Sequence, residues 1–233
     1  MTQHHAELLM YTAPEPIRVA NERWLARILE HLGHTRLNAE GLSLRELWLS
    51  PNLLLTQTCG YPLMTALKGQ IRVIGRPRYE LPDASAGNHC SLILSRADDP
   101  RKTLPAFRDS RGVINSEDSN SGMNLLRQRL APLHRDGQFF STVGNRGGHR
   151  EVRGLRVVGR SAFGPTLPFI TSASATDEQI ERLRQVMNQS LHELPDVVQT
   201  LGLPEVLAAG EGDYQVVLDY LREAHELGYG RLR

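Results

Sequence analysis

Apolar residues recur three or four positions apart in several long segments of the chain, which is the pattern of amphipathic helices. The first such segment begins at Pro14 and ends at Gly33. The second begins at Thr176, which forms a capping box with Gln179. A third helix is expected over Asp213–Leu227. These three helices are the longest regular elements that the pattern predicts.

Short apolar runs bounded by turn residues predict strands between and before these helices. The runs are Glu7–Tyr11, Leu53–Gln57, Ile71–Gly75, Ser91–Leu94, Gly112–Asn115 and Leu155–Val158. Shorter helices are expected at Leu44–Leu49, Cys59–Gly69, Thr103–Phe107 and Pro195–Leu201, and another from Ser119 onward. Strands that alternate with helices favour an α/β fold with largely parallel sheets.

Two irregular stretches rich in proline and glycine, residues 76–88 and 159–168, interrupt this alternation. Each is expected to carry the chain from one lobe to another. Two such crossings imply that one lobe is inserted in the other. We therefore predict a first lobe made of residues 1–82 and 166–233, with residues 83–165 as the inserted second lobe.

The amino-acid composition excludes some classes of function. The chain has 233 residues, 40% of them hydrophobic, and 27 basic residues against 26 acidic ones leave a net charge of +1. This balance predicts a soluble globular protein without a nucleic-acid partner or membrane insertion. Cys59 and Cys90 are the only cysteines and are expected to be small buried hydrophobes. No signal peptide is recognised, because the apolar run Leu8–Met10 is too short for one.

The start of the helix after Ile114 is the strongest candidate for chemistry. Ser119, Asn120 and Ser121 lie where the polar turn becomes a helix. The first backbone N–H groups of a helix lack partners inside it, and the helix dipole adds partial positive charge there. A phosphate or carboxylate could bind at this point without a lysine. The same pattern also fits an ordinary N-cap with nothing bound.

A glycine-rich turn, Phe139–Arg150, carries His149 and two arginines. Its backbone could approach an anion closely, although a solvent loop has the same composition. The sequence signatures of dinucleotide sites, phosphate loops, serine hydrolases and zinc peptidases are absent. We therefore expect no catalytic residue, no metal and no cofactor.

Several stretches in a fixed order carry a family resemblance. They are Gln57–Leu63, Ser119–Gly122, Gly147–Arg150, Leu155–Ser161 and Leu167–Phe169. In this order they resemble the phosphate/phosphonate-type substrate-binding proteins of ABC transporters. The resemblance implies a type II periplasmic-binding-protein fold, in which two α/β lobes with largely parallel sheets are joined by two hinge crossovers. The ligand-binding residues that it implies are Tyr11 and Tyr61 on the first lobe and Ser119, Asn120, Ser121 and His149 on the second.

The chain departs from this family after Arg150. Members of the family continue with a helix and a strand, whereas Glu151–Leu155 follows here at once. A segment of about 17 residues or more is therefore either deleted or missing from the sequence shown. His149, which precedes this point, could contact the ligand, cap the next helix or bond a loop carbonyl.

The sequence as a whole predicts a monomeric solute-binding protein. It would capture a small oxyanion, phosphonate-like or phosphate-like, between its lobes by hinge closure and deliver it to an ABC permease. The alternative is a cytoplasmic enzyme or ligand sensor on the same scaffold. A periplasmic location is expected if the sequence is a mature form, and a cytoplasmic one otherwise.

Overall fold

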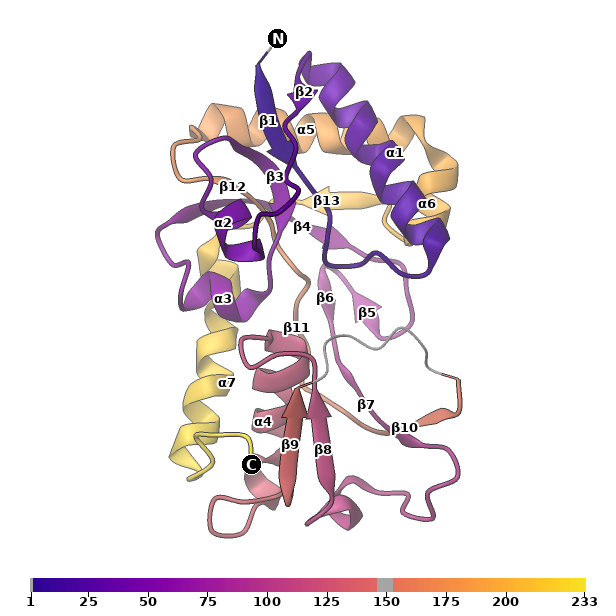
Figure 1. The fold of residues 1–233 in the computed structure, drawn as a ribbon, viewed down its shortest axis with the longest axis vertical. Helices are drawn as coiled ribbons and strands as arrows, with labels where there is room; N and C mark the ends of the chain where they lie inside the picture. Colours follow the sequence, from indigo (N-terminus) through magenta and orange to yellow (C-terminus); the bar gives the residue numbers. More distant parts are fainter. Residues whose placement is uncertain (1, 146–152) are drawn as a thin grey trace.

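The computed structural model describes residues 2–145 and 153–233. The upper part of the molecule in Figure 1 is built on a six-stranded sheet with the order β13-β4-β12-β3-β1-β2. Its strands are β1 (Gln3–Ala6), β2 (Thr35–Arg36), β3 (Leu53–Gln57), β4 (Ile71–Arg78), β12 (Phe169–Ser172) and β13 (Glu205–Leu207). Strand β1 pairs in parallel with β2 and β3, whereas β12 runs antiparallel to β3 and β4, and β13 runs antiparallel to β4.

Helices cover both faces of this sheet (Figure 1). One face carries α1 (Glu15–Leu32), α5 (Asp177–Glu193) and α6 (Pro195–Leu201), and the other carries α2 (Leu44–Trp48), α3 (Gly60–Met64), the short turn η4 (Glu211–Tyr214) and the start of α7 (Gln215–Glu226). Successive residues of a strand point to opposite faces. Phe169 of β12 accordingly packs in the first cluster and Ile170 in the second.

Helix boundaries follow the predicted capping signals. Gly33 ends α1 in the left-handed conformation with φ of 65°, where glycine carries no Cβ penalty. Thr176 and Gln179 form the predicted capping box at the start of α5. The first strand was predicted wrongly at Glu7–Tyr11, because β1 lies at Gln3–Ala6 and pairs there with β2 and β3.

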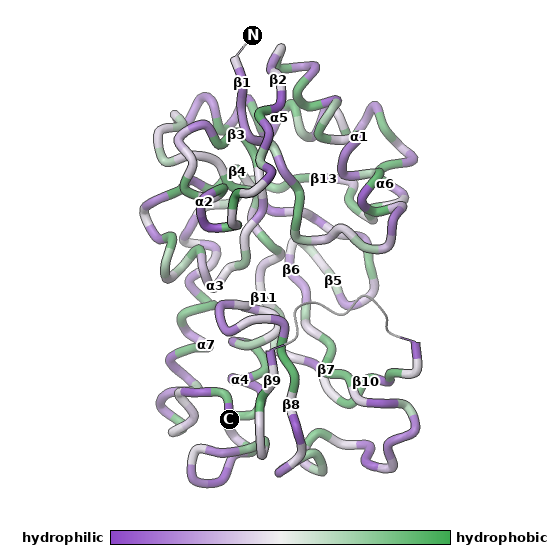
Figure 2. Tube along the Cα trace, viewed as in Figure 1, coloured by the Kyte–Doolittle hydropathy of each residue, from purple (hydrophilic) through white to green (hydrophobic). Residues whose placement is uncertain are grey.

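The lower part of the molecule contains two separate two-stranded sheets. Strand β7 (Leu92–Arg96) pairs antiparallel with β10 (Leu155–Arg160), and β8 (Arg111–Ile114) pairs in parallel with β9 (Thr142–Asn145). The helical elements here are η1 (Leu104–Phe107), η2 (Asn120–Asn124), α4 (Leu125–Leu130) and η3 (Ala131–Leu133). Figure 2 shows hydrophobic segments along β7 and β8. Leu92 and Leu94 of β7 are 42% and 38% exposed, and Val113 of β8 is 37% exposed.

Short strands join the two parts. Strands β5 (Ala84–Ser85), β6 (Asn88–His89) and β11 (Gly164–Pro165) form a small sheet where the chain passes down and back. Next to it, the Thr166 hydroxyl donates a hydrogen bond of 2.7 Å to the carbonyl of Pro77, and the Thr166 N–H donates one of 3.0 Å to the carbonyl of Gly87. These bonds tie the outgoing crossover to the returning one.

Helix α7 connects the two parts a third time, and Figure 1 shows it running from α3 down beside α4. Val217 near its start packs with the upper part, whereas Ala224 near its end packs in the lower cluster with Leu130 and Phe139. The predicted division at residues 82 and 165 stays a prediction. The structure adds that the last ten or so residues of the chain pack on the lower part.

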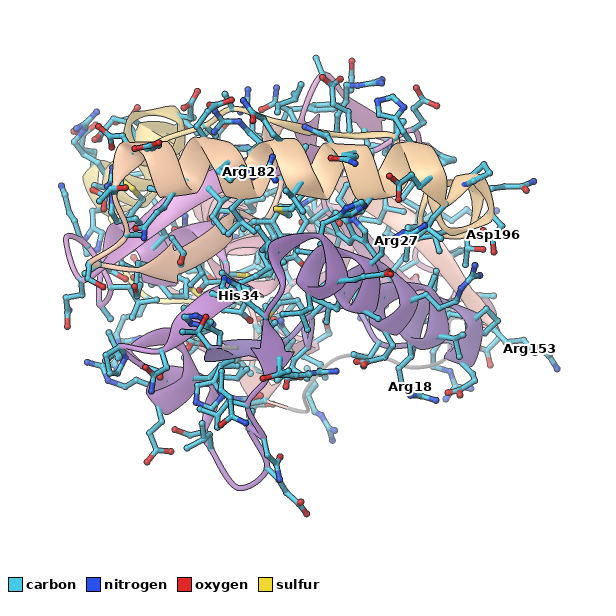
Figure 3. The ribbon with its side chains drawn as sticks, turned by 90° about the horizontal axis from the view of Figure 1, so that it is seen from above. Arg18, Arg27, His34, Arg153, Arg182 and Asp196 are labelled. Carbon is cyan, nitrogen blue, oxygen red and sulfur yellow. The ribbon has the colours of Figure 1, made fainter. Side chains whose placement is uncertain are left out.

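Ion pairs on the outside hold α1 against α5 and α6. Arg23 pairs with Asp196, and Arg27 Nε lies 2.7 Å from an oxygen of Glu193. Figure 3 shows Arg27 and Asp196 at this helical interface. Within residues 2–145 and 153–233, no helix combines the length and apolar character required to span a bilayer.

Candidate functional site

Two cavities meet where the upper and lower parts of the molecule join. The first has a volume of about 440 Å³ and the second of about 730 Å³. Tyr11 and His89 line both cavities, whereas Ser121 and Gly122 line only the second. Of the predicted residues, Tyr11 and Ser121 therefore border the same space, whereas Ser119 and Asn120 are buried and line neither cavity.

Tyr11 lies in the loop between β1 and α1. The side-chain amide of Asn21 donates a 2.8 Å hydrogen bond to the Tyr11 carbonyl and fixes this loop. Tyr11 is 46% exposed and lines both cavities. Desolvation by the surrounding protein raises the pKa of its phenol, and the nearby ionisable groups of Tyr79 and Cys59 add to this shift.

The helix start at Ser119 has the predicted cap. Ser119 is extended, and its hydroxyl accepts a 2.9 Å hydrogen bond from the N–H of Gly122. Gly122 has no room for a side chain, because an added Cβ would lie 1.8 Å from the Asn115 amide oxygen. The Ser119 side chain thus acts as an N-cap, and the N–H groups of Asn120 and Ser121 are left without a partner inside the helix.

Cys59 faces these donors from the upper part of the molecule. It is the N-cap residue of α3, and α3 contacts η2 directly. The thiol is buried, and burial raises its pKa. The backbones of Asn120 and Ser121 and the Ser119 hydroxyl act in the opposite direction, because their donors favour the thiolate. The start of the helix at Ser119 therefore directs its donors at the sulfur atom of Cys59, which itself stands at the start of α3.

Tyr61 is placed differently from the other predicted residues. It lies on α3, half-buried against the second apolar cluster, with the Arg127 guanidinium 6.0 Å from its ring centre. Among the described residues that line the two cavities, Tyr61 does not appear. His149 lies outside the described residues. Its predicted position opposite Tyr61 stays a prediction.

Sequence reasoning missed three polar residues of this region. Burial raises the pKa of Tyr79 to about 12, although a hydrogen bond with Gln57 opposes the shift. Burial lowers the pKa of His89, and the Gly164 backbone opposes that shift. The Nδ1 atom of His89 is buried and has no hydrogen-bond partner among the described residues. Of the three, only Gln57 had a signal in the sequence, because it is the last residue of a predicted buried strand.

Metal chemistry has no support in residues 2–145 and 153–233, where no three His, Cys, Asp or Glu side chains are grouped closely enough to hold an ion. The converging donors are instead backbone N–H groups and hydroxyls, which bind anions.

No protein-family model matches this sequence, and no curated protein matches it. Solved structures do match its fold. A binding-protein component of an ABC phosphonate transporter from Pseudomonas aeruginosa superposes with a TM-score of 0.78 at 13% identity, covering 97% of this chain and 88% of that one. PhnD1 from Prochlorococcus marinus in complex with methylphosphonate gives a TM-score of 0.71 at 9% identity, covering 97% and 99%.

XAC2383 from Xanthomonas citri bound to ATP gives a TM-score of 0.64 at 11% identity, and the match covers 98% of each chain. The fold is accordingly that of the two-lobed periplasmic binding proteins, which confirms the predicted α/β architecture. Its sheets are mixed rather than largely parallel, because β12 and β13 run antiparallel to their neighbours. The upper and lower parts of Figure 1 are its two lobes.

Proposed function

We propose that this protein is a solute-binding protein that captures a small oxyanion, phosphonate-like or phosphate-like, between its lobes. The observation that carries the proposal is that the Asn120 and Ser121 N–H groups and the Ser119 hydroxyl, all at one helix start, converge on the buried Cys59 thiol. A helix start adds partial positive charge as well as N–H donors. An anion in place of the sulfur would be a stronger acceptor for these donors.

Cys59 occupies the place that we assign to an oxygen of the ligand. A thiol is a weak hydrogen-bond acceptor, whereas a charged oxygen forms bonds to N–H groups about twice as strong as neutral ones. Hinge opening would separate Cys59 from Asn120 and Ser121, and closure over a ligand would replace the sulfur with an oxyanion. The described conformation then corresponds to the closed arrangement of the lobes.

The wider role that we propose is delivery of this ligand to an ABC permease from the periplasm. The phosphonate transporter component and the methylphosphonate complex with the same fold support this choice. An enzyme on the same scaffold would need a nucleophile or a base in the cleft. Burial raises the pKa of Cys59 and so disfavours its reactive thiolate, which argues against Cys59 as that nucleophile.

A thermal-shift titration with methylphosphonate, inorganic phosphate and malate tests the proposal. A ligand at 100 times its Kd adds about 2.7 kcal/mol to the free energy of unfolding, which shifts the melting temperature by several degrees. We expect such a shift with methylphosphonate or phosphate and none with an uncharged control such as glycerol. If no anion shifts the melting temperature up to 10 mM, the proposal is wrong.

A further inference from the structure

The smaller cavity has the character of a pocket for an apolar group. Most of its lining is apolar or aromatic, including Ile17, Trp24, Leu81, Phe169 and Leu203. Its volume of about 440 Å³ lies in the usual range of small-molecule sites. It is also well above the roughly 150 Å³ that accommodates a benzene ring in an engineered core. The cavity therefore has room for at least one aromatic ring.

Three polar side chains in its lining, those of Asn21, Gln57 and Asp83, already have partners, whereas His89 offers one unpaired nitrogen. The Asn21 amide bonds the Tyr11 carbonyl, and the Gln57 amide donates to the carbonyl of Leu167 at 3.4 Å. Asp83 accepts a 2.9 Å bond from Arg160. A charged ligand group placed here would lose its hydration and gain few partners. The occupant must be an uncharged part of a molecule.

This apolar cavity adjoins the second cavity, which reaches the helix start at Ser121. Tyr11 and His89 line both cavities, and Ser121 at the helix start lines the second one. A single ligand can therefore place a charged group at Ser121 and an uncharged body past Tyr11.

We infer that the ligand is an oxyanion that carries an apolar body of about one aromatic ring, with the body held in the cavity beneath α1. This inference rests on the proposed function and narrows it. A bare phosphate or methylphosphonate would fill only the anion site and would leave the apolar cavity to water. His89 lines both cavities, and its Nδ1, which has no partner among the described residues, can accept a hydrogen bond from a polar group that links the anion to the apolar body.

Calorimetry with phenylphosphonate and methylphosphonate tests this inference, because the two share a head group. Burial of a ring stabilises a complex enough to lower the Kd by roughly tenfold or more. We expect the Kd of phenylphosphonate to be at least tenfold lower. If both bind with equal Kd, the inference is overturned while the proposed function stands. If neither binds, the proposed function fails and the inference fails with it.

Ala84→Phe supplies the second arm of the test. Ala84 is half-buried in the cavity lining, so a phenyl group there would occupy the space that we assign to the ligand body. We expect this variant to lose the preference for phenylphosphonate and to keep its affinity for methylphosphonate, which also shows that it is folded. Ala26→Phe makes the same change on the exposed side of α1 and should keep the preference. Retention of the preference in Ala84→Phe would overturn the inference.

Discussion

At the scale of single residues, Asn120 offers the cleanest test of anion capture by the backbone. Ser119 before it is extended, a conformation that a following proline accepts, and Asn120 is the first residue of its helix. Proline at this position therefore removes one N–H donor without breaking the helix. Alanine removes the same side chain and keeps the donor.

We predict that Asn120→Pro weakens oxyanion binding roughly tenfold or more relative to Asn120→Ala, because a hydrogen bond to a charged group contributes about 1.5–3 kcal/mol. Both variants lose the bond between the Asn120 and Asn124 side chains, so their stabilities should fall together. Isothermal titration calorimetry of the two variants with methylphosphonate measures the difference. Equal Kd values would show that the Asn120 N–H does not hold the ligand.

A second residue-scale prediction concerns Cys59. In our proposal, the contact of Cys59 with Asn120 and Ser121 holds the lobes closed without a ligand. Molecules in that state cannot bind, so the apparent affinity falls as their fraction rises. A serine hydroxyl is a better acceptor than a thiol and should strengthen the contact with Asn120 and Ser121. Cys59→Ser should therefore raise the apparent Kd, and Cys59→Ala should not. A lower Kd in the serine variant would contradict this competition.

The candidate site was partly predictable from sequence. The pattern around Ser119, Asn120 and Ser121 predicted a helix start, and the structure has one there. The role of Cys59 was not predictable, since its partners lie far along the chain and a lone cysteine has no local signature. His89 was missed for the same reason. Its neighbours Tyr11 and Gly164 come from distant parts of the sequence.

At the scale of elements, the tail after α7 stabilises the lower lobe. Tyr229 is fully buried, stacks on His134 with ring centres 5.1 Å apart, and donates a 2.6 Å hydrogen bond to the Arg233 carbonyl. That carbonyl also accepts the N–H groups of Phe139 and Phe140. One side chain thus joins α7, the chain end and the segment before β9.

Tyr229→Ala should lower the free energy of unfolding by about 3–5 kcal/mol, as for other large buried aromatic residues. Tyr229→Phe keeps the ring and should cost only about 1 kcal/mol, the value of one hydrogen bond. Urea titration measures both. Tyr220→Phe is the matched control, because the Tyr220 hydroxyl bonds the Phe163 carbonyl at an exposed position. A loss in that control equal to the loss in Tyr229→Phe would argue against the role of burial.

Elements with capping signals and strong periodicity were predicted well, as α1 and α5 show. Short strands were not. Strand β2 has two exposed residues, and β13 at Glu205–Leu207 has three residues without alternation, so neither carries a local pattern. Both strands form because a neighbouring strand has a free edge to pair with. That edge is set by the tertiary structure and cannot be seen in the local sequence.

At the scale of the whole molecule, the junction between the lobes should respond to pH through His89. Burial lowers the pKa of this histidine below its unfolded value near 6.5. The unfolded chain then binds more protons than the folded one as the pH falls below about 6.5, so stability decreases on acidification. The contribution of neutral His89 to the free energy of unfolding is fully present above pH 6.5.

We predict that the melting temperature of the parent protein drops between pH 7.5 and pH 5.5 by more than that of His89→Gln. Burial also lowers the pKa of His34 and contributes a loss of the same sign, so the difference between the two proteins is the informative quantity. Differential scanning calorimetry at several pH values measures it. Parallel curves would mean that His89 does not contribute.

The division of the lower lobe into two small sheets also bears on how the protein behaves when concentrated. Among the described residues, β7 and β8 each pair with one strand only, and consecutive residues of both line the larger cavity. Unpaired strand edges beside exposed Leu92, Leu94 and Val113 are templates for strand pairing between molecules.

Stored samples should therefore lose monomer at a rate that rises with the square of concentration, as light scattering would record. A lysine in place of Val113 should slow this loss by charging the edge. Val19→Lys places the same charge on α1, where Val19 is 43% exposed, and should leave the rate unchanged. The sheet edges that border the larger cavity would then set the shelf life of the purified protein.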